Sequence, residues 1–337
     1  MRGLPSQLLW WVVDIGLGLL LWSALLLTWM GMTESGSRFA TELAIKLAGL
    51  PVHISAVDGQ YFERVTLRGI VYSSGQGAIS IDRLTADWDP AALLRGELRL
   101  HVLAASGITL PAANRAADKL DLPSYRLPLE VTIEHLQLAD LVYGAGSAAP
   151  TIDRLTANVH LSPAMLKLEA LSLVTPQGHV QGKARLTPRR PYTLQASATW
   201  SADLAGLGQS RGQARIQGDS QRLEFRHDLQ APGRMTTQGQ LTDLLDQPRL
   251  SLRHSWQDIA WPPTAASDWS SPTGSLVLNG WLDSWSAHVD ARMLPPEHTE
   301  PVQIATALTG DQRMLQITAF QLALRDGQIR GRGELTW

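Results

Sequence analysis

The sequence AISIDRLTADW at residues 78–88 shares the hexapeptide IDRLTA with PTIDRLTANVHL at residues 150–161. Around the first copy, apolar residues follow the spacing Ile79, Ile81, Leu84 and Ala86. A regular β-strand cannot keep these four on one face, because a three-residue step moves the side chain to the opposite face. A β-bulge, which inserts one extra residue into a strand, absorbs the additional position and bends the strand. The repeated hexapeptide therefore predicts a repeated, bent β-hairpin.

The same apolar spacing recurs along the chain, and residues 166–186 align without gaps to residues 315–335. Repetition of one hairpin unit predicts a stack in which each unit contacts its neighbours. We therefore expect an all-β fold over residues 51–337: a long, curved, repetitive antiparallel β-sheet, with residues 111–128 as a linker or an insertion. Bulges or sharp bends are expected at six residue pairs: Arg68-Gly69, Asp82-Arg83, Glu134-His135, Asp153-Arg154, Glu169-Ala170 and Thr318-Ala319.

The N-terminal residues predict a membrane anchor. Residues 8–32 carry one charge, Asp14, and are long enough to cross the roughly 30 Å hydrocarbon core as one transmembrane helix. Arg2 precedes this stretch, which places the N-terminus in the cytoplasm and the rest of the chain beyond the membrane. Residues 1–32 are thus expected to be a cytoplasmic N-terminus and a signal anchor. The aromatic residues expected to fix its position are Trp10, Trp11, Trp22 and Trp29.

A short amphipathic helix is expected over residues 33–50. Phe39, Leu43, Leu47 and Leu50 recur there at helical spacing, with charged residues elsewhere on the circumference. This helix could lie on the membrane surface or close the end of the sheet. A further helical turn is expected over residues 89–96, between a Pro-containing start and a closing Gly.

The residue content argues against several classes of function. The chain has no Cys, which excludes disulfides and thiol catalysis, and its net charge of −2 gives no indication of nucleic-acid binding. The nine His residues lack metal-binding spacing, so we expect no metal and no cofactor. The string GQSRG at residues 208–212 matches a nucleophile elbow, but strand-like alternation follows it where a helix is required. We expect no enzymatic activity.

Two groups of residues leave alternatives open. Arg325, Arg330 and Arg332 could bind a lipid phosphate, although the interspersed acidic residues favour a solvated face. A group of five tryptophans forms either an aromatic platform for a ligand or the filling of a half-buried sheet: Trp256, Trp261, Trp269, Trp281 and Trp285.

An ordered set of motifs resembles the N-terminal portion of the TamB family, within the AsmA-like group, and spans the whole chain. The set begins with ESG at residues 34–36, after the anchor. It continues with VDGQYFERVTLRGIVY at residues 57–72, IDRLTADWDPAALLRGEL at 81–98, WQDIAWPP at 256–263 and SPTGSLVLNGWLDSW at 271–285.

The resemblance implies an inner-membrane protein whose β-sheet groove, apolar inside, crosses the periplasm. It implies two roles: conducting phospholipid between the inner and outer membranes or, alternatively, acting as a scaffold of the translocation and assembly module that assists insertion of outer-membrane β-barrel proteins. Family members end in a C-terminal domain that contacts the outer-membrane barrel TamA. That domain is absent from this sequence, so we expect the chain to be truncated at its C-terminus.

The spacing also predicts which side chains line the groove. Because neighbours in a strand alternate faces, five polar residues should face solvent: Thr85, Asp87, Thr156, Asn158 and Ser172. The residues expected to line the groove and contact lipid are Leu84, Ala86, Trp88, Leu155, Ala157, Val159, Leu171 and Leu173.

Overall fold

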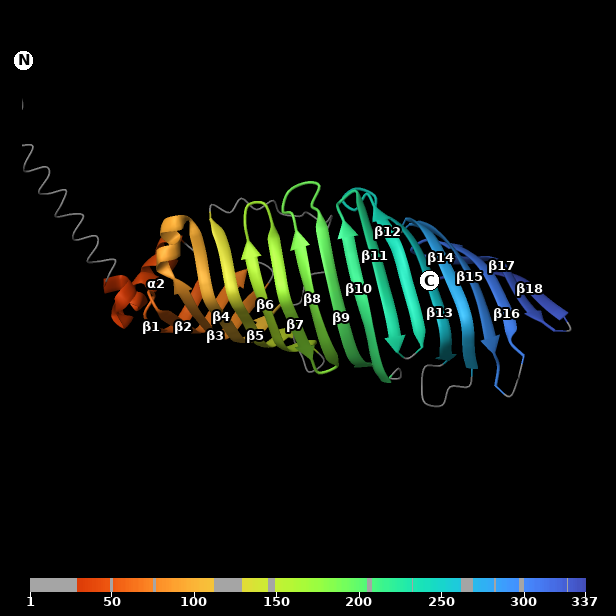
Figure 1. Cartoon of the computed structure of the whole chain (residues 1–337), viewed down its shortest axis with the longest axis horizontal. Coiled ribbons are helices and arrows are strands. Elements are labelled where there is room, and N and C mark those ends of the chain that lie inside the picture. The colour runs from red at the N-terminus through yellow and green to blue at the C-terminus, as the bar shows by residue number, and fades with distance from the viewer. Residues whose placement is uncertain are drawn as a thin grey trace, which may run out of the picture. The chain divides into compact units, whose positions relative to one another are not determined.

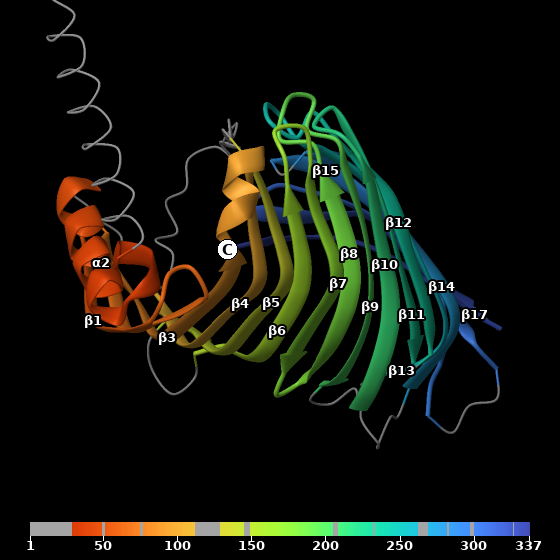
Figure 2. The same ribbon diagram turned by 60° about the vertical axis from the view of Figure 1, so that its left-hand side comes forward.

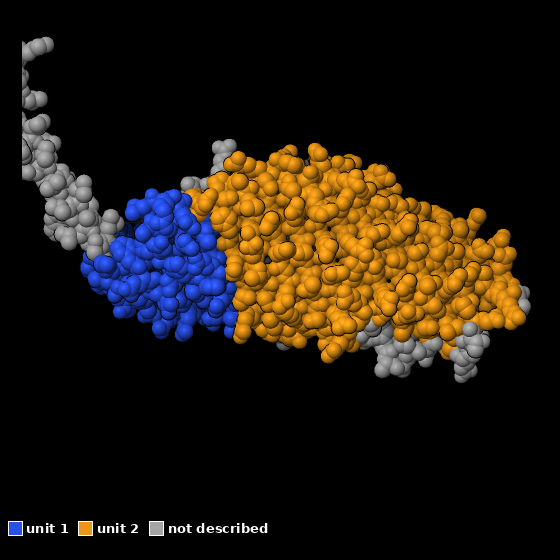
Figure 3. Space-filling view, viewed as in Figure 1, with its two compact units in different colours: residues 1–114, 131–152 blue, residues 115–130, 153–337 orange. Residues whose placement is uncertain are grey.

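The computed structural model describes residues 29–48, 51–74, 77–111, 129–144, 149–204, 208–231, 233–261, 269–281, 283–296, 300–325 and 327–337. Over these ranges the chain is all-β, with eighteen strands of open antiparallel sheet, a short α-helix and a short 3-10 helix. The chain divides into two compact units (Figure 3). Unit 1 comprises residues 1–114 and 131–152, and unit 2 comprises residues 115–130 and 153–337.

Unit 1 contains the α-helix, the 3-10 helix and the first five strands (Figure 1). β1 pairs with β2, β2 with β3 and β3 with β4, all antiparallel. Its buried apolar residues include Val57, Val65, Ile70, Leu100, Ala105 and Ile108. The elements are α2 (Glu34–Ala48), β1 (Val52–Gly59), β2 (Arg64–Ser74), β3 (Gly77–Asp89), η1 (Pro90–Arg95), β4 (Glu97–Leu110) and β5 (Glu130–Tyr143).

The helical turn expected over residues 89–96 is confirmed as η1. The Asp89 side chain caps its N-terminus by accepting a hydrogen bond of 2.9 Å from the Ala91 backbone N–H. Gly96 ends it with φ of 77°, a left-handed conformation that glycine adopts without steric cost.

The helix expected over residues 33–50 is α2, and it covers β1. The Arg38 Nε atom donates a hydrogen bond of 3.0 Å to the Val57 backbone carbonyl. Ser37 is fully buried, and its Oγ accepts from the Tyr61 backbone N–H at 3.2 Å. The hydroxyls of Thr41 and Tyr61 lie 2.5 Å apart. Of the two positions considered for this helix, the structure shows it against the end of the sheet of unit 1, where it packs on β1, a strand that among the described strands pairs only with β2.

Most of the expected transmembrane segment, with Trp10, Trp11 and Trp22, lies outside the described residues. Trp29 is described; it is exposed and packs against Phe39, with ring centroids 5.9 Å apart. Within the described ranges, no helix combines the length and the apolar content that crossing a bilayer requires. Residues 112–128, which contain nearly all of the expected linker, also lie outside the described residues.

Unit 2 is a ladder in which each strand pairs with the next strand along the chain (Figure 1). Its strands bend along their length, so the sheet of this unit is curved (Figure 2). The strands are β6 (Thr151–Leu161), β7 (Leu166–Thr175), β8 (Gly178–Leu186), β9 (Leu194–Leu204), β10 (Gly208–Gly218), β11 (Arg222–Ala231), β12 (Arg234–Thr242), β13 (Arg249–Trp261), β14 (Trp269–Trp281), β15 (Ser284–Leu294), β16 (Val302–Gly310), β17 (Met314–Leu324) and β18 (Gly327–Thr336).

Two of the expected bulges in unit 2 are confirmed. The register of β7 with β8 shifts between Leu168 and Leu171, and Ala170 has a positive φ of 49°. The register of β17 with β18 shifts between Ile317 and Phe320, at the expected Thr318-Ala319 position. In both strands the bulge keeps the flanking apolar residues on one face, as the three-residue step requires.

In unit 1 the expected irregularity takes a different form. Gly69, with φ of 59°, and Asp82 are both left out of the β2–β3 ladder, while Arg68 still pairs with Arg83 and Ile70 with Ile81. The register does not shift, because the two strands are interrupted at the same level. The three-residue spacing of the apolar positions therefore comes from an interruption that β2 and β3 have at the same level, and not from a bulge in one strand.

The bend expected at Asp153-Arg154 is not found in the β6–β7 ladder. Arg154 pairs regularly with Val174, and the register shifts instead between Thr156 and Asn158. The reason is that the extra residues of β7 at the Glu169-Ala170 bulge lie opposite this point of β6. The second IDRLTA copy therefore meets its irregularity later in the strand than the first copy does. The bend at Glu134-His135 stays a prediction.

Candidate functional site: the apolar face of the sheet

The registers of unit 2 align apolar residues on one face of every strand. Directly paired residues share a face, and one such row runs from Leu155 through Leu173 and Val180 to Trp200. Further along, Leu252 pairs with Leu278, which pairs with Ala287. We call the side of unit 2 that carries these residues the apolar face. It extends from β6 to β18, and the alternate residues of each strand form the polar face.

The predicted lining residues of unit 2 all lie on this apolar face. Leu155 pairs with Leu173, and Leu171 pairs with Gly182 of β8. Ala157 and Val159 are buried, with 2% and 9% of their surface exposed, while the three leucines are half-buried. The alternation expected from the sequence thus holds through β6 and β7.

In unit 1, Leu84 and Ala86 also sit opposite apolar partners. Leu84 pairs with Leu67 and Ala105, and Ala86 pairs with Val65. Trp88 is half-buried, but its indole N–H donates to the Tyr61 backbone carbonyl. This contact fixes the loop between β1 and β2, so Trp88 has a structural role that the sequence did not indicate.

Four of the five residues expected to face solvent are only half-exposed. Asn158 is exposed, whereas Thr85, Asp87, Thr156 and Ser172 are half-buried. Polar partners across the ladder cover them: the Thr85 hydroxyl lies 3.2 Å from that of Thr66, and Asp87 binds Arg64 at 2.8 Å. Alternation predicted the face correctly but overestimated exposure, because cross-strand pairs shield each other.

Aromatic rings on the apolar face lie over glycines of adjacent strands. Trp285 pairs with Gly310, and a Cβ added there would meet its ring at 2.6 Å. The Phe225 ring lies similarly over Gly239, at 2.8 Å, and the Trp200 ring over Gly212, at 2.9 Å. Such pairing accommodates a large ring without displacing the neighbouring strand. This feature was not predicted, although the Gly residues within the strands are its signal in the sequence.

The five C-terminal tryptophans do not form one platform. Trp256 and Trp285 lie on the apolar face, each opposite a glycine. Trp281 lies on the polar face, where the Arg249 guanidinium sits 4.9 Å from its ring centroid. The structure therefore favours the sheet-filling interpretation for Trp256 and Trp285.

The polar face carries cross-strand hydrogen bonds and ion pairs. Ser251 donates to Asn279 at 2.6 Å, and Arg226 binds Asp228 at 2.9 Å. Arg226, with smaller contributions from Thr236 and Gln213, lowers the pKa of Asp228 against the opposing effect of burial. Arg330 is exposed on this face and donates to Gln328, so it lies on a solvated polar surface.

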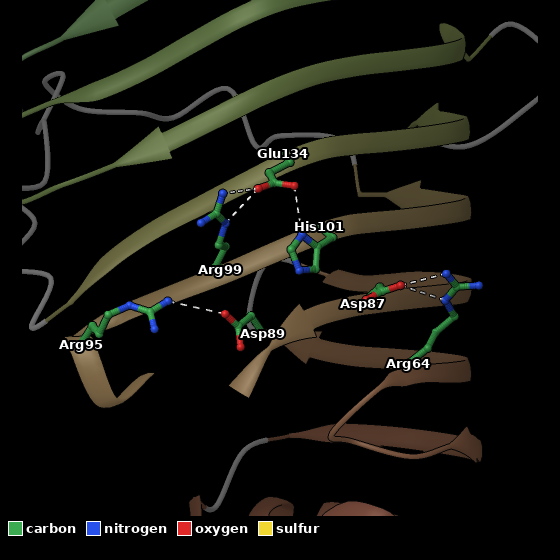
Figure 4. A network of polar contacts seen from close by, with 7 residues as sticks. All are labelled: Arg64, Asp87, Asp89, Arg95, Arg99, His101 and Glu134. Carbon is green, nitrogen blue, oxygen red and sulfur yellow. Dashed lines mark hydrogen bonds and ion pairs between the residues drawn. The ribbon is translucent and has the colours of Figure 1, made fainter. Parts of the chain in front are cut away.

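A similar polar network occupies unit 1 (Figure 4). Glu134 of β5 accepts from Arg99 at 2.8 Å and lies 3.0 Å from His101 Nδ1. These hydrogen bonds, that of His101 foremost, lower the pKa of Glu134. Asp89 binds Arg95 nearby at 3.5 Å. These contacts join β4 to β5 and fix the end of β3, so their role is structural.

The GQSRG string begins strand β10. Ser210 is buried and donates to the Gly208 carbonyl at 3.3 Å, in a strand that runs on to Gly218. The strand-turn-helix context of a nucleophile elbow is therefore not present at this motif.

Two histidines interrupt the apolar face, and the sequence analysis did not single them out. His227 lies between Phe225 and Leu229 in β11, and His254 lies between Leu252 and Trp256 in β13. In the sequence, each histidine lies two residues from an apolar residue on either side, and this alternation is the signal that could have identified them.

The fold and this face together define a class of protein: an open antiparallel β-sheet built from consecutive hairpins, with one extended apolar surface. The family model described as TamB, N-terminal domain, matches residues 111–337, more than half of the chain. The chain belongs to the TamB family. No curated protein and no solved structure matches the chain.

Proposed function

We propose that this protein conducts phospholipid along the apolar face, between the inner and outer membranes. The observation that carries the proposal is the alignment of apolar side chains on one face from strand to strand of unit 2. A half-exposed apolar surface of this kind suits acyl chains, since each buried CH₂ contributes about 0.8 kcal/mol. Passage along a surface needs no catalytic group.

Membership of the TamB family supports the setting of this proposal. The protein would be held in the inner membrane by residues 8–32, with its sheet in the periplasm. The outer-membrane barrel TamA would be its partner.

The proposal is tested by placing a charge on each face of one strand. Leu155→Arg puts an unpaired charge on the apolar face, where desolvation is costly. Thr156→Arg puts the same charge on the polar face of the same strand, opposite Ser172. Leu155→Arg should abolish co-purification of phospholipid, and Thr156→Arg should retain it. In cells, a photo-reactive residue at position 155 should crosslink phospholipid and one at 156 should not; equal labelling would contradict the proposal.

A further inference from the structure

The two histidines on the apolar face belong to one polar row that crosses three adjacent strands of unit 2. His227 of β11 pairs with Thr237 of β12, and Thr237 pairs with His254 of β13. Their immediate neighbours in the row are Ala214 and Leu276. We call His227, Thr237 and His254 the histidine row.

The contacts of the row determine which ring nitrogen of His227 carries the proton. Trp200 Nε1 donates to His227 Nε2 at 3.0 Å, and the two rings are stacked at 5.8 Å. An indole nitrogen is only ever a donor, so His227 Nε2 must carry its lone pair. The imidazole is therefore neutral in this arrangement, with its proton on Nδ1.

His254 is held by the hydroxyl between the two histidines. Its Nδ1 lies 2.7 Å from Thr237 Oγ1, and burial, with a smaller effect of the nearby His227, lowers the pKa of His254. Among the described residues, neither His227 Nδ1 nor His254 Nε2 has a hydrogen-bond partner. Two imidazoles thus keep unused polar atoms on a half-buried surface, where an unsatisfied donor is unfavourable.

The apolar-face neighbours of the row are uncharged: Ala214 and Leu276 within it, and Phe225, Leu229, Leu252 and Trp256 beside the two histidines. Asp258 of β13, beyond Trp256, interrupts the β13–β14 ladder with a φ of 54°. The nearby charged residues of these strands alternate onto the polar face: Arg211, Arg215, Arg222, Glu224, Arg226, Asp228, Arg234, Arg249 and Arg253, as does Asp203 of β9.

We propose that the histidine row binds the phosphate of a phospholipid head group while the adjacent apolar residues hold its acyl chains. The proposal rests on the lipid-conducting function and adds a defined head-group binding site to it. A phosphate accepts hydrogen bonds from the His227 Nδ1–H, from the free N–H of His254 and from the Thr237 hydroxyl, and its negative charge favours the protonated form of His254. Binding therefore takes up a proton at His254, and affinity for the phosphate rises as the pH falls through the pKa of this residue.

The test measures binding to the detergent-solubilised full chain by native mass spectrometry at pH 7.5 and pH 5.5. Didecanoyl phosphatidylglycerol is compared with didecanoylglycerol, which has the same chains but no phosphate; inorganic phosphate is a third probe. The double variant His227→Phe/His254→Phe removes both rings. The control variant His288→Phe removes an exposed histidine of the polar face in β15.

The preference for phosphatidylglycerol over didecanoylglycerol should rise about tenfold between pH 7.5 and pH 5.5, as charge-assisted hydrogen bonds replace neutral ones. The rise should persist in His288→Phe and vanish in the double variant, which should still bind didecanoylglycerol. If the double variant does not fold, His254→Gln alone should weaken the rise.

Three results would overturn the proposal. A preference independent of pH, or one kept by the double variant, refutes the histidine row but leaves lipid conduction intact. Binding of inorganic phosphate with the same pH dependence assigns the row to free phosphate. Failure to bind either lipid removes the proposed function and the histidine row with it.

Discussion

On the apolar face, aromatic rings pack over glycines of the adjacent strand. Trp256 lies over Gly274, where an added Cβ would overlap the ring. The Trp256 Nε1 atom donates to Ser271 Oγ at 2.7 Å, and Ser271 Oγ in turn donates to the Arg292 carbonyl at 2.8 Å. The ring is therefore held in place by packing and by hydrogen bonds that reach the next strand.

Gly274→Val should destabilise unit 2 by about 1–3 kcal/mol, because the new side chain displaces the Trp256 ring in a packed surface. Gly327→Val is the matched control: a Cβ at Gly327 meets nothing within 4 Å. Its effect should stay within about 0.5 kcal/mol. Urea unfolding followed by circular dichroism measures both changes, and equal effects would show that the ring does not depend on the glycine.

Ala170 gives a second prediction at this scale. Its φ of 49° is unfavourable for a residue with a Cβ, at a cost of about 1–2 kcal/mol. Ala170→Gly should therefore leave stability unchanged or raise it by up to about 1 kcal/mol. Ala323→Gly, in a regular part of β17, should lower stability by about 0.5–1 kcal/mol. Thermal unfolding of the two variants checks the opposite signs, and a loss at both positions would contradict the bulge assignment.

At the scale of elements, α2 protects the first strand of unit 1. Arg38 hydrogen-bonds to the Val57 carbonyl and binds Glu34 at 2.7 Å and Asp58 at 4.0 Å. Both side chains of the nearer ion pair are more than half exposed, so this pair contributes little to stability. The hydrogen bond to the backbone is therefore the contact that holds α2 on β1.

Arg38→Ala should increase amide hydrogen exchange in β1 by several-fold, since loss of one hydrogen bond costs about 1 kcal/mol of local stability. Exchange in β12 and β13 of unit 2 should not change. Glu42→Ala, an exposed position of the same helix, is the control. Unchanged exchange in β1 would mean that α2 does not protect this strand.

The elements were largely predictable from sequence, because the period of the apolar pattern depends only on local backbone geometry. The 3-10 turn and two bulges were predicted at the correct residues. The bend near Asp153 was misplaced, because a register shift belongs to a pair of strands, and the position of the β7 bulge decides where β6 departs from regular pairing. The histidine row and the Trp88 contact were missed because they depend on which strands are neighbours.

At the scale of the whole molecule, the apolar pattern of residues 8–32 and the position of Arg2 predict the topology. A reporter that is active only in an oxidising compartment, fused after Trp337, should be active, and one fused before residue 8 should be silent. The positive charge that precedes the apolar stretch is the physical reason. Good expression without activity of the C-terminal fusion would reverse the predicted orientation.

The pairing of each strand in unit 2 with its predecessor has a consequence for how the protein is made. If the strands emerge from a membrane in chain order, each hairpin can be completed as soon as it emerges, because no strand from β7 to β18 requires a partner that is synthesised later. Each new strand is templated by a finished edge, and that edge remains unpaired only until the next turn closes. Strand pairing in unit 2 can therefore keep pace with the emergence of the chain.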